Sequence, residues 1–336
     1  MQSMTQFSRR HVMSIAGSAC LSFPLSGCNS NQPALIAADA LSADYPTVAA
    51  LTFMTDRLRE KTDGRIKTEI YSGAQLGAER DTLEISMFGG IDFNRVNLAP
   101  LNPIAKSTIV PSLPFVFRSI PHMRAAMDGA PGQKILASLA EHDLIGLCFY
   151  DSGARSFYNT IKPIRTPDDL KGMKIRVQNS NLYVAMVEAL GANATPMSFS
   201  EVYQSLVQGV IDGAENNWPS YENTRHFEAA RYYSLTQHLM TPEILVMSAR
   251  RWKMMSDNDR ELVMESARES VPFMRQIWDA RVNSAMEVVK KSGVEIIETI
   301  DKDPFIKCMQ PVYDRFLTPN LRELMEEIQD MESADV

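Results

Sequence analysis

Residues 166–197 read TPDDLKGMKIRVQNSNLYVAMVEALGANATPM, and this stretch contains a strand, a helix and a further strand in succession. It opens with Thr166-Pro167-Asp168-Asp169, a pattern typical of a helix start, in which an N-cap precedes a proline. Segments 173–177 and 194–197 have the apolar pattern of buried strands, and 181–190 has that of a helix between them. This order predicts parallel strands and an α/β fold.

The same alternation continues on both sides of this stretch. Toward the N-terminus we expect helices at 46–60, 79–88 and 121–142, and strands at 65–70, 91–96 and 144–149. Toward the C-terminus we expect a helix at 200–208 and a strand at 210–211. Residues 256–291 are strongly helical, and Pro272 should divide them into a shorter helix and one of about twenty residues. That second helix would be about 30 Å long, which is enough to cross two lobes.

Gly153 separates two sets of these elements. We therefore predict two α/β lobes with largely parallel sheets around a central cleft, and a long helix that braces both lobes. The chain should cross between the lobes near 151–153 and again near 237–242. The expected boundaries are 28–152 plus about 241–281 for the first lobe, and 153–240 plus about 282–336 for the second.

Composition narrows the class of protein. The 336 residues are 45% hydrophobic and 22% charged, which excludes bulk disorder. There are 34 Lys plus Arg against 41 Asp plus Glu, so a general attraction to phosphate backbones is lacking and nucleic acid is not an expected partner. The motifs GxGxxG, Walker A, GxSxG and HExxH are absent, and the histidines lack the spacing of metal ligands. We therefore predict no cofactor, no metal and no catalytic residue.

Residues 1–27 have the pattern of an export signal. Arg9 and Arg10 are followed by an apolar run over 12–25, which is too short to span a membrane. The run ends in Leu25-Ser26-Gly27-Cys28, which is similar to a bacterial lipobox, so we expect Cys28 to carry a lipid that anchors the mature protein in the periplasm; the alternative is a chance cysteine. Residues 8–13 resemble a twin-arginine motif, although paired basic residues also occur in ordinary signals, so the export route stays open.

Two cysteines, Cys148 and Cys308, would remain after cleavage and lipidation. Because Cys148 lies in an apolar strand, we expect two free buried thiols; a disulfide is the alternative in an oxidising periplasm. No later segment has the roughly 20 consecutive apolar residues of a membrane span, so only the lipid is expected to hold the mature chain to a membrane.

Several blocks carry a family resemblance. They are Gly153-Ala154-Arg155-Ser156-Phe157, Lys171-Gly172-Met173-Lys174-Ile175-Arg176-Val177, residues 209–218 (GVIDGAENNW) and Gln75-Leu76-Gly77. With this spacing they resemble the DctP-type solute receptors of TRAP transporters over essentially the whole mature chain. The resemblance implies a two-lobed receptor with a periplasmic-binding-protein-like α/β fold. Such a receptor captures an organic acid and delivers it to a separate membrane permease, and the resemblance implies no enzymatic activity. We expect a monomer.

The resemblance also assigns the residues that hold the acid group. In this family an arginine at the position of Arg176 makes the main salt bridge to the ligand carboxylate. An arginine at the end of an apolar strand is costly without a partner, and its planar fork meets both carboxylate oxygens. The alternative is an ion pair with Asp168 or Asp212. Arg155 and Asn216 match two further family contacts, with a surface arginine and a turn residue as their alternatives.

Aromatic and amide side chains are expected to complete the walls of the cleft. Asn217 is expected to contact the ligand, and Trp218, which directly follows it, could lay its ring against the apolar face of a sugar. Tyr45 lies where the first strand should meet its helix, and it could line the cleft. Phe199 could pack on the ligand, or it could belong to the core.

Three polar residues near the first lobe's strand ends could bind hydroxyl groups. They are Glu79, Arg95 and Asn97. Arg95 and Asn97 emerge from the end of a strand, where ligands of α/β proteins usually bind. Glu79 could instead be an acid in the first turn of a helix, where it favours the helix dipole. Arg95 could instead be a charged residue at a sheet edge.

The ligand expected from this set is a hexuronate such as glucuronate or galacturonate. Asp44-Tyr45-Pro46-Thr47 and residues 214–220 (AENNWPS) are most similar to the sugar-acid branch of the family. One carboxylate clamp with many hydroxyl partners suits a uronate. The alternative is a C4-dicarboxylate, with Arg95 or Arg155 as a second cation. More remote alternatives are an exported sugar-acid lyase or hydrolase, with a general base or metal near the clamp, and a purely structural lipoprotein.

Overall fold

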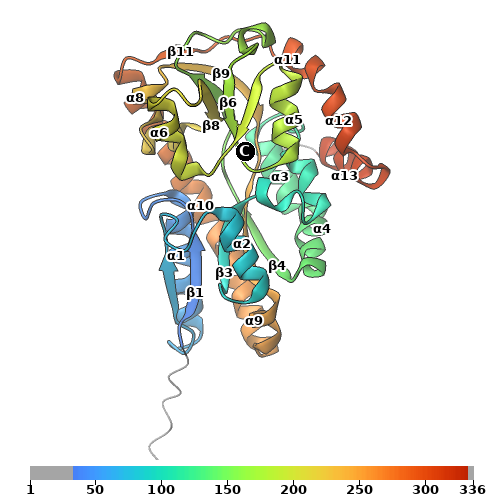
Figure 1. The fold of residues 1–336 in the computed structure, drawn as a ribbon. Coiled ribbons are helices and arrows are strands. Elements are labelled where there is room, and N and C mark those ends of the chain that lie inside the picture. Colours follow the sequence, from blue (N-terminus) through green and yellow to red (C-terminus); the bar gives the residue numbers. More distant parts are fainter. Residues whose placement is uncertain (1–32, 332–336) are drawn as a thin grey trace, which may run out of the picture. The chain divides into compact units, whose positions relative to one another are not determined.

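The computed structural model describes residues 33–331, and the export signal and Cys28 lie outside them. Within the described residues the strands form two mixed sheets (Figure 1). The first sheet has the order β2-β1-β3-β10-β4, with β1 (Leu35–Asp39), β2 (Thr68–Tyr71), β3 (Phe93–Asn97), β4 (Leu144–Tyr150) and β10 (Glu243–Ser248). The second has the order β11-β9-β5-β8-β6-β7, with β5 (Arg155–Asn159), β6 (Lys174–Val177), β7 (Asn193–Pro196), β8 (Gly213–Asn216), β9 (Tyr232–Leu239) and β11 (Glu295–Ile297).

The chain passes between the sheets over 151–154 and 240–242. Both connections are too short to carry the chain back along a sheet. The strands that follow them, β5 and β10, therefore begin at the junction and run away from it. As a result β10 runs antiparallel to β3 and β4, and β5 runs antiparallel to β8 and β9. The expected largely parallel sheets are therefore mixed. Gly153 has a φ of +63° within the first connection, a conformation that a glycine adopts without strain.

Helices cover both sheets and connect them. They are α1 (Pro46–Lys61), α2 (Glu79–Phe88), α3 (Ile120–Asp128), α4 (Ala130–Ser138), α5 (Asn181–Ala189), α6 (Val202–Val207), α7 (Trp218–Asn223), α8 (His226–Ala229), α9 (Ala249–Met254), α10 (Asp257–Lys291), α11 (Asp303–Cys308), α12 (Gln310–Phe316) and α13 (Pro319–Asp330). Short 3₁₀ helices occupy Ala99–Leu101, Lys106–Ser112, Leu139–His142, Pro167–Leu170 and Phe199–Glu201. None of the helices within 33–331 combines the length and the apolar character that crossing a membrane requires.

Helix α10 is continuous over 35 residues, or about 52 Å, and contacts elements of both sheets. Its first half packs on α1, where Lys61 forms ion pairs of 2.9 Å with Glu265 and Glu269. Its second half packs on α7, where Arg281 pairs with Glu222. The expected break at Pro272 is wrong. A proline removes one backbone donor, and the packing of both halves against other elements keeps the helix unbroken.

Three further local predictions differ from the structure. Residues 121–142 form α3, α4 and a 3₁₀ helix, because the chain is extended at Gly129 between the two α-helices. The strand expected at 210–211 is β8, which starts at Gly213. The helix start predicted at Thr166 is followed only by the short 3₁₀ helix Pro167–Leu170.

The last helix packs away from the second sheet. His122 of α3 contacts the Ile328 carbonyl oxygen at 2.8 Å, and Lys134 of α4 binds Glu327. Helix α13 therefore contacts elements that we grouped with the first lobe, whereas we grouped residues 282–336 with the second.

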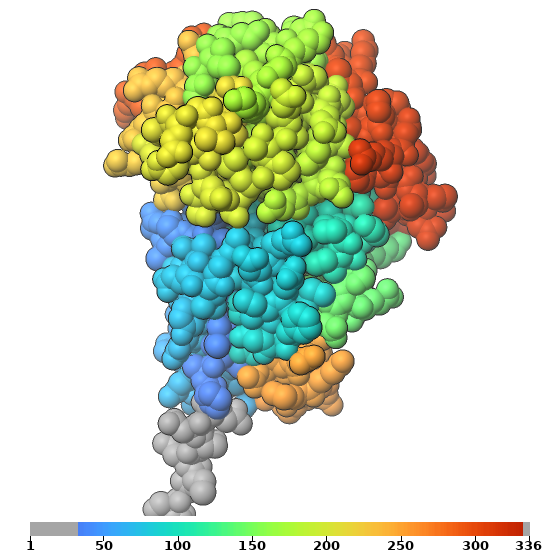
Figure 2. Space-filling model, viewed as in Figure 1, coloured from blue at the N-terminus to red at the C-terminus, as the bar shows by residue number. Residues whose placement is uncertain are grey.

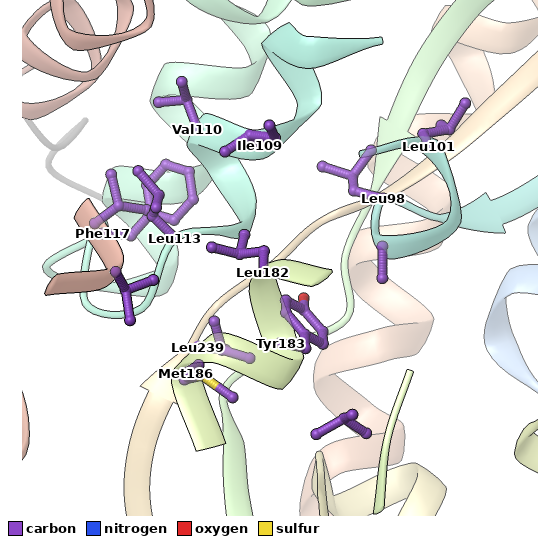
Figure 3. Close-up of a cluster of buried hydrophobic side chains, with 14 of the residues drawn as sticks. Leu98, Leu101, Ile109, Val110, Leu113, Phe117, Leu182, Tyr183, Met186 and Leu239 are labelled. Atoms are coloured by element: carbon purple, nitrogen blue, oxygen red, sulfur yellow. The ribbon is translucent and has the colours of Figure 1, made fainter. Parts of the chain in front are cut away.

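One buried apolar cluster contains residues from both sides of the cleft (Figure 3). The segment 98–117 contributes Leu98, Ile109 and Leu113, and α5 contributes Leu182 and Met186. This shared core joins the lobes beside the cleft. Figure 2 shows the surfaces of the two lobes in contact along a narrow seam.

The two cysteines of the described region are free thiols. Cys148 is buried in β4, as expected, whereas Cys308 at the end of α11 is only half-buried. Burial was therefore correctly predicted for Cys148 alone.

Trp278 of α10 should be a principal support of the junction. Its ring is buried against Gly153 and meets the Tyr45 ring edge-on at a centroid distance of 6.0 Å. We expect Trp278→Ala to lower the free energy of unfolding by about 3–5 kcal/mol, because it leaves a large cavity. Chemical denaturation measures the change. Val288→Ala on the exposed face of the same helix is the control, and an equal effect of both substitutions would contradict the assignment.

Candidate ligand-binding site

The strand ends that face each other between the sheets enclose a cavity of about 120 Å³. It lies where β1, β3, β6 and β8 end and where β5 and β10 begin, in agreement with the general place of ligands in α/β sheets. The lining residues are Ala40, Leu41, Gly73, Ala74, Ala78, Glu79, Arg80, Asn97, Pro100, Arg155, Arg176, Gln178, Asn179, Met197, Ser198, Phe199, Ser200, Asn216, Ser220 and Glu243. Six of the ten predicted ligand contacts are among them.

Arg176, at the end of β6, is a buried cation without a carboxylate partner among residues 33–331. Its Nε and Nη2 both donate to the Met197 carbonyl oxygen, at 3.1 and 2.8 Å. The alternative partners are engaged elsewhere, since Asp168 pairs with Lys171 and Asp212 accepts from the Lys174 amide. Burial lowers the pKa of the Arg176 guanidinium, and the nearby Glu215 partly offsets this decrease. Such a cation is stabilised by an anion that enters the cavity.

Arg155, at the start of β5, is equally buried but has its own counterion. Its Nε and Nη2 donate to the two oxygens of Glu215 at 2.6 and 2.8 Å, and its Nη1 donates to Asn216 Oδ1 at 2.8 Å. Asn216 Oδ1 also accepts from the Asn217 amide, which turns Nδ2 of Asn216 toward other partners. Arg155, Asn216 and Arg176 line the same cavity. The two alternatives, a surface arginine and a turn residue, are wrong.

Two buried groups behind this pair were missed by sequence reasoning. Glu215 neutralises Arg155 from the interior of β8. His238 lies 3.9 Å from Glu215 Oε2 and stacks on Phe157 at 4.1 Å. Burial and the nearby Arg155 hold the pKa of His238 well below its ordinary value, so the ring is neutral. Neither residue carried a signal beyond its place in an apolar strand.

The opposite wall belongs to the first sheet and is acidic. Arg95 is fully buried there and pairs bidentately with Asp39, while its Nη1 donates to Glu79 Oε1 at 2.9 Å. Asn97 Nδ2 donates to both oxygens of Glu79, at 2.9 and 3.0 Å. Glu79, Asn97 and Glu243 line the cavity, whereas Arg95 lies behind them. Arg95 does not line the cavity, because carboxylates of the protein occupy its donors, so its contact with the ligand stays a prediction.

Glu243 begins β10 and was not predicted. Burial raises its pKa to about 7; Arg95 acts in the opposite direction, and Glu79 and Asp39 reinforce the increase. Within residues 33–331, no group of His, Cys, Asp and Glu side chains is arranged to hold a metal ion.

Three other predicted contacts do not line the cavity. The Trp218 ring meets Tyr233 edge-on at 4.4 Å, because Asn217 caps α7 by accepting from the Ser220 amide at 2.8 Å and so fixes the helix orientation. Asn217 Nδ2 is engaged by the Ser152 carbonyl oxygen at 2.8 Å. The Tyr45 hydroxyl is buried against Ser220 Oγ at 2.8 Å. Trp218 thus packs within the second lobe, whereas Asn217 and Tyr45 stabilise the junction between the lobes.

Phe199 does line the cavity, with the Arg176 guanidinium 5.8 Å from its ring centroid. Gln178 and Asn179 also line the cavity and were missed, although both directly follow β6, which ends one residue after Arg176. The rule applied to Arg95 and Asn97, that polar residues after a strand face the ligand, could have found them.

Two sheets joined by short connections, with a charged cavity between their strand ends, define a solute-binding protein. The family described as DctP, bacterial extracellular solute-binding protein, family 7, matches residues 37–320, and the chain belongs to this family. It is therefore a solute receptor of the TRAP transporter type.

Relatives of known structure have been crystallised with uronates. A TRAP periplasmic solute-binding protein from Xanthobacter autotrophicus, with bound β-D-galacturonate, is 49% identical at a TM-score of 0.87, over 89% of this chain and 100% of that chain. One from Chromohalobacter salexigens, with bound D-glucuronate, is 43% identical at a TM-score of 0.86, over 88% and 99%. A solute-binding protein of C. salexigens is 44% identical over 86% of this chain and 87% of its own length.

The raised pKa of Glu243 predicts a pH-dependent cost to stability. The folded protein retains this proton up to about pH 7, whereas the unfolded chain loses it near the ordinary value of 4.5. Between these values the folded state binds more protons, so this group's contribution to stability falls as the pH rises, by about 1.4 kcal/mol per pH unit.

Glu243→Gln removes this cost. We expect the ligand-free variant to be more stable than the parent at pH 8, with a difference that shrinks toward pH 5. Urea unfolding at pH 5, 6.5 and 8 measures this difference. A gap that stays constant with pH would contradict the assignment.

Proposed function

We propose that this receptor binds a hexuronate, such as glucuronate or galacturonate, in the periplasm and delivers it to the membrane permease of a TRAP transporter. The observation that carries the proposal is the polarity of the cavity. One end holds Arg176 without a counterion, and the other end is lined by Glu79, Asn97 and Glu243. A molecule with one carboxylate and several hydroxyl groups is complementary to both ends.

The same polarity argues against a C4-dicarboxylate. Such a ligand needs a second cation, and the two candidates are already neutralised, Arg95 by Asp39 and Arg155 by Glu215. A second carboxylate would also face Glu79 and Glu243. The uronates bound by the similar proteins of X. autotrophicus and C. salexigens support the same ligand class.

The ligand acts as a latch in this proposal. Arg176, Arg155 and Asn216 belong to the second sheet, and Glu79 and Glu243 belong to the first sheet and its helix α2. A uronate held by both sides favours the closed state that the permease recognises. The receptor is monomeric in this proposal, and a lipid on Cys28 keeps it at the membrane.

Binding and release, without chemical change, is the proposed activity. Glu243 lines the cavity with a pKa of about 7, a value suited to a general base, so a sugar-acid lyase or hydrolase would have a testable candidate residue. Incubation of the uronate with the protein, followed by NMR, separates the two functions. Recovery of unchanged uronate supports the receptor, and new resonances would establish an enzyme.

Uronate binding should require Arg176, whereas the stability of the ligand-free protein should not require it. We expect galacturonate and glucuronate to raise the melting temperature of a soluble chain that starts at Asn29, and succinate and malate to leave it unchanged. Arg176→Ala should weaken uronate binding by about 100-fold or more, because it removes the uncompensated cation. The ligand-free variant should melt no lower than the parent, since a buried charge without a partner is removed.

Arg322→Ala, on the exposed face of α13, is the control and should bind uronates like the parent. Isothermal titration calorimetry measures each dissociation constant. Tight uronate binding by Arg176→Ala would exclude this residue as the carboxylate site. A response to the four-carbon diacids alone would overturn the uronate proposal.

A further inference from the structure

Glu243 combines burial, a place in the cavity wall and an unused acceptor. Its side chain is only 2% exposed and lines the cavity from the first residue of β10. Its Oε2 accepts no hydrogen bond from residues 33–331, although Arg95 Nη1 lies 3.1 Å away without hydrogen-bond geometry. A buried carboxylate oxygen without a hydrogen-bond donor is uncommon, so Glu243 keeps acceptor capacity that residues 33–331 do not use.

The other carboxylates of the cluster are already satisfied. Asp39 on β1 accepts from the Leu41 amide at 2.8 Å, from Thr47 Oγ1 at 2.9 Å and from Arg95. Glu79 on α2 accepts from Arg95 and from Asn97.

Four further groups complete the surroundings of Glu243. Tyr45, at the N-terminus of α1, and Ser152, in the connection between β4 and β5, both face Glu243. Arg95 on β3 and the Glu79 carboxylate also face it. Only one of these groups, Arg95, is cationic. The wall is therefore net negative, and Glu243 is its carboxylate with an open acceptor.

We propose that Glu243 determines specificity: its carboxylate accepts a hydrogen bond from a hydroxyl at the end of the ligand opposite the carboxyl group, and it excludes ligands with a second carboxylate there. The inference rests on the proposed uronate function. It goes beyond that function because it assigns the rejection of diacids to one residue.

The physical reason is the difference between a hydroxyl and a carboxylate at the same place. A hydroxyl donates a charge-assisted hydrogen bond to Glu243. A carboxylate brings a like charge into a site of low dielectric, where repulsion is poorly screened. One residue thus both favours the correct ligand and opposes the wrong one.

Galacturonate and galactarate form the test pair. Galactarate is the six-carbon diacid obtained when C1 of galacturonate is oxidised. It shares one carboxylate with galacturonate but is open-chain, whereas galacturonate forms a ring, so the binding of each ligand is compared between the parent and the variant. In Glu243→Gln we expect galacturonate to bind about tenfold more weakly, and galactarate to bind more tightly than it binds the parent. The ratio of the two dissociation constants should therefore change by more than tenfold. Calorimetry at pH 8 measures it.

Two matched variants separate specificity from damage to the fold. Glu323→Gln, an exposed glutamate of α13, should leave the ratio unchanged. Glu243→Asp retains the charge, so it should still reject galactarate while it binds galacturonate more weakly. General damage weakens both ligands together, whereas loss of the proposed role moves them in opposite directions.

A pH series gives a second readout. As the pH falls from 8 to 6, protonation of Glu243 should tighten galactarate binding to the parent, and the Glu243→Gln variant should show no such change. An unchanged ratio in Glu243→Gln, with tight galacturonate binding to the parent, would overturn this inference and leave the uronate function intact. Failure of the parent to bind any uronate would instead refute the proposed function on which the inference rests.

Discussion

A guanidinium group buried without a counterion is the constraint on which this site depends. Among residues 33–331, Arg176 has only the Met197 carbonyl oxygen as a hydrogen-bond partner, whereas Arg155, on β5 of the same sheet, has Glu215. The ligand-free protein therefore retains the cost of one desolvated charge, and the carboxylate of a ligand offsets that cost. Binding strength and the marginal stability of the free receptor come from the same interaction, so improving one by mutation reduces the other.

The backbone explains why opposite charges occupy opposite walls. The two short connections make β5 and β10 start at the cleft, beside strands that end there. In each sheet, some strands begin and others end at the cleft. Side chains at these strand ends are therefore close to one another. The second sheet contributes Arg155 and Arg176, and the first contributes Glu243. A ligand that contacts both walls must span the cleft, which is the basis of the closure that we propose.

Most of the fold could be predicted from the sequence, because apolar periodicity located most of the strands. The position of Arg176 in the cavity wall agrees with the family resemblance and with the cost of a charge at the end of an apolar strand, while its contact with the ligand stays a prediction. The orientation of Trp218 could not be predicted, since it depends on how Asn217 caps α7. The burial of Arg95 depends on its ion pair with Asp39 in the adjacent strand, and a single sequence does not reveal this ion pair. Glu243 resembles an ordinary start of the apolar strand EILVMS.

The place of β10 in the first sheet affects how the protein can be made. This strand lies between β3 and β4, yet it follows β4 by more than 90 residues, which form most of the second lobe. During folding, β3 and β4 must keep exposed edges until the chain returns, and exposed edges favour misassociation. The first lobe therefore cannot be completed before the second has largely formed. Neither lobe can be cut out at a single point of the chain, and truncation after residue 240 would remove the centre of one sheet.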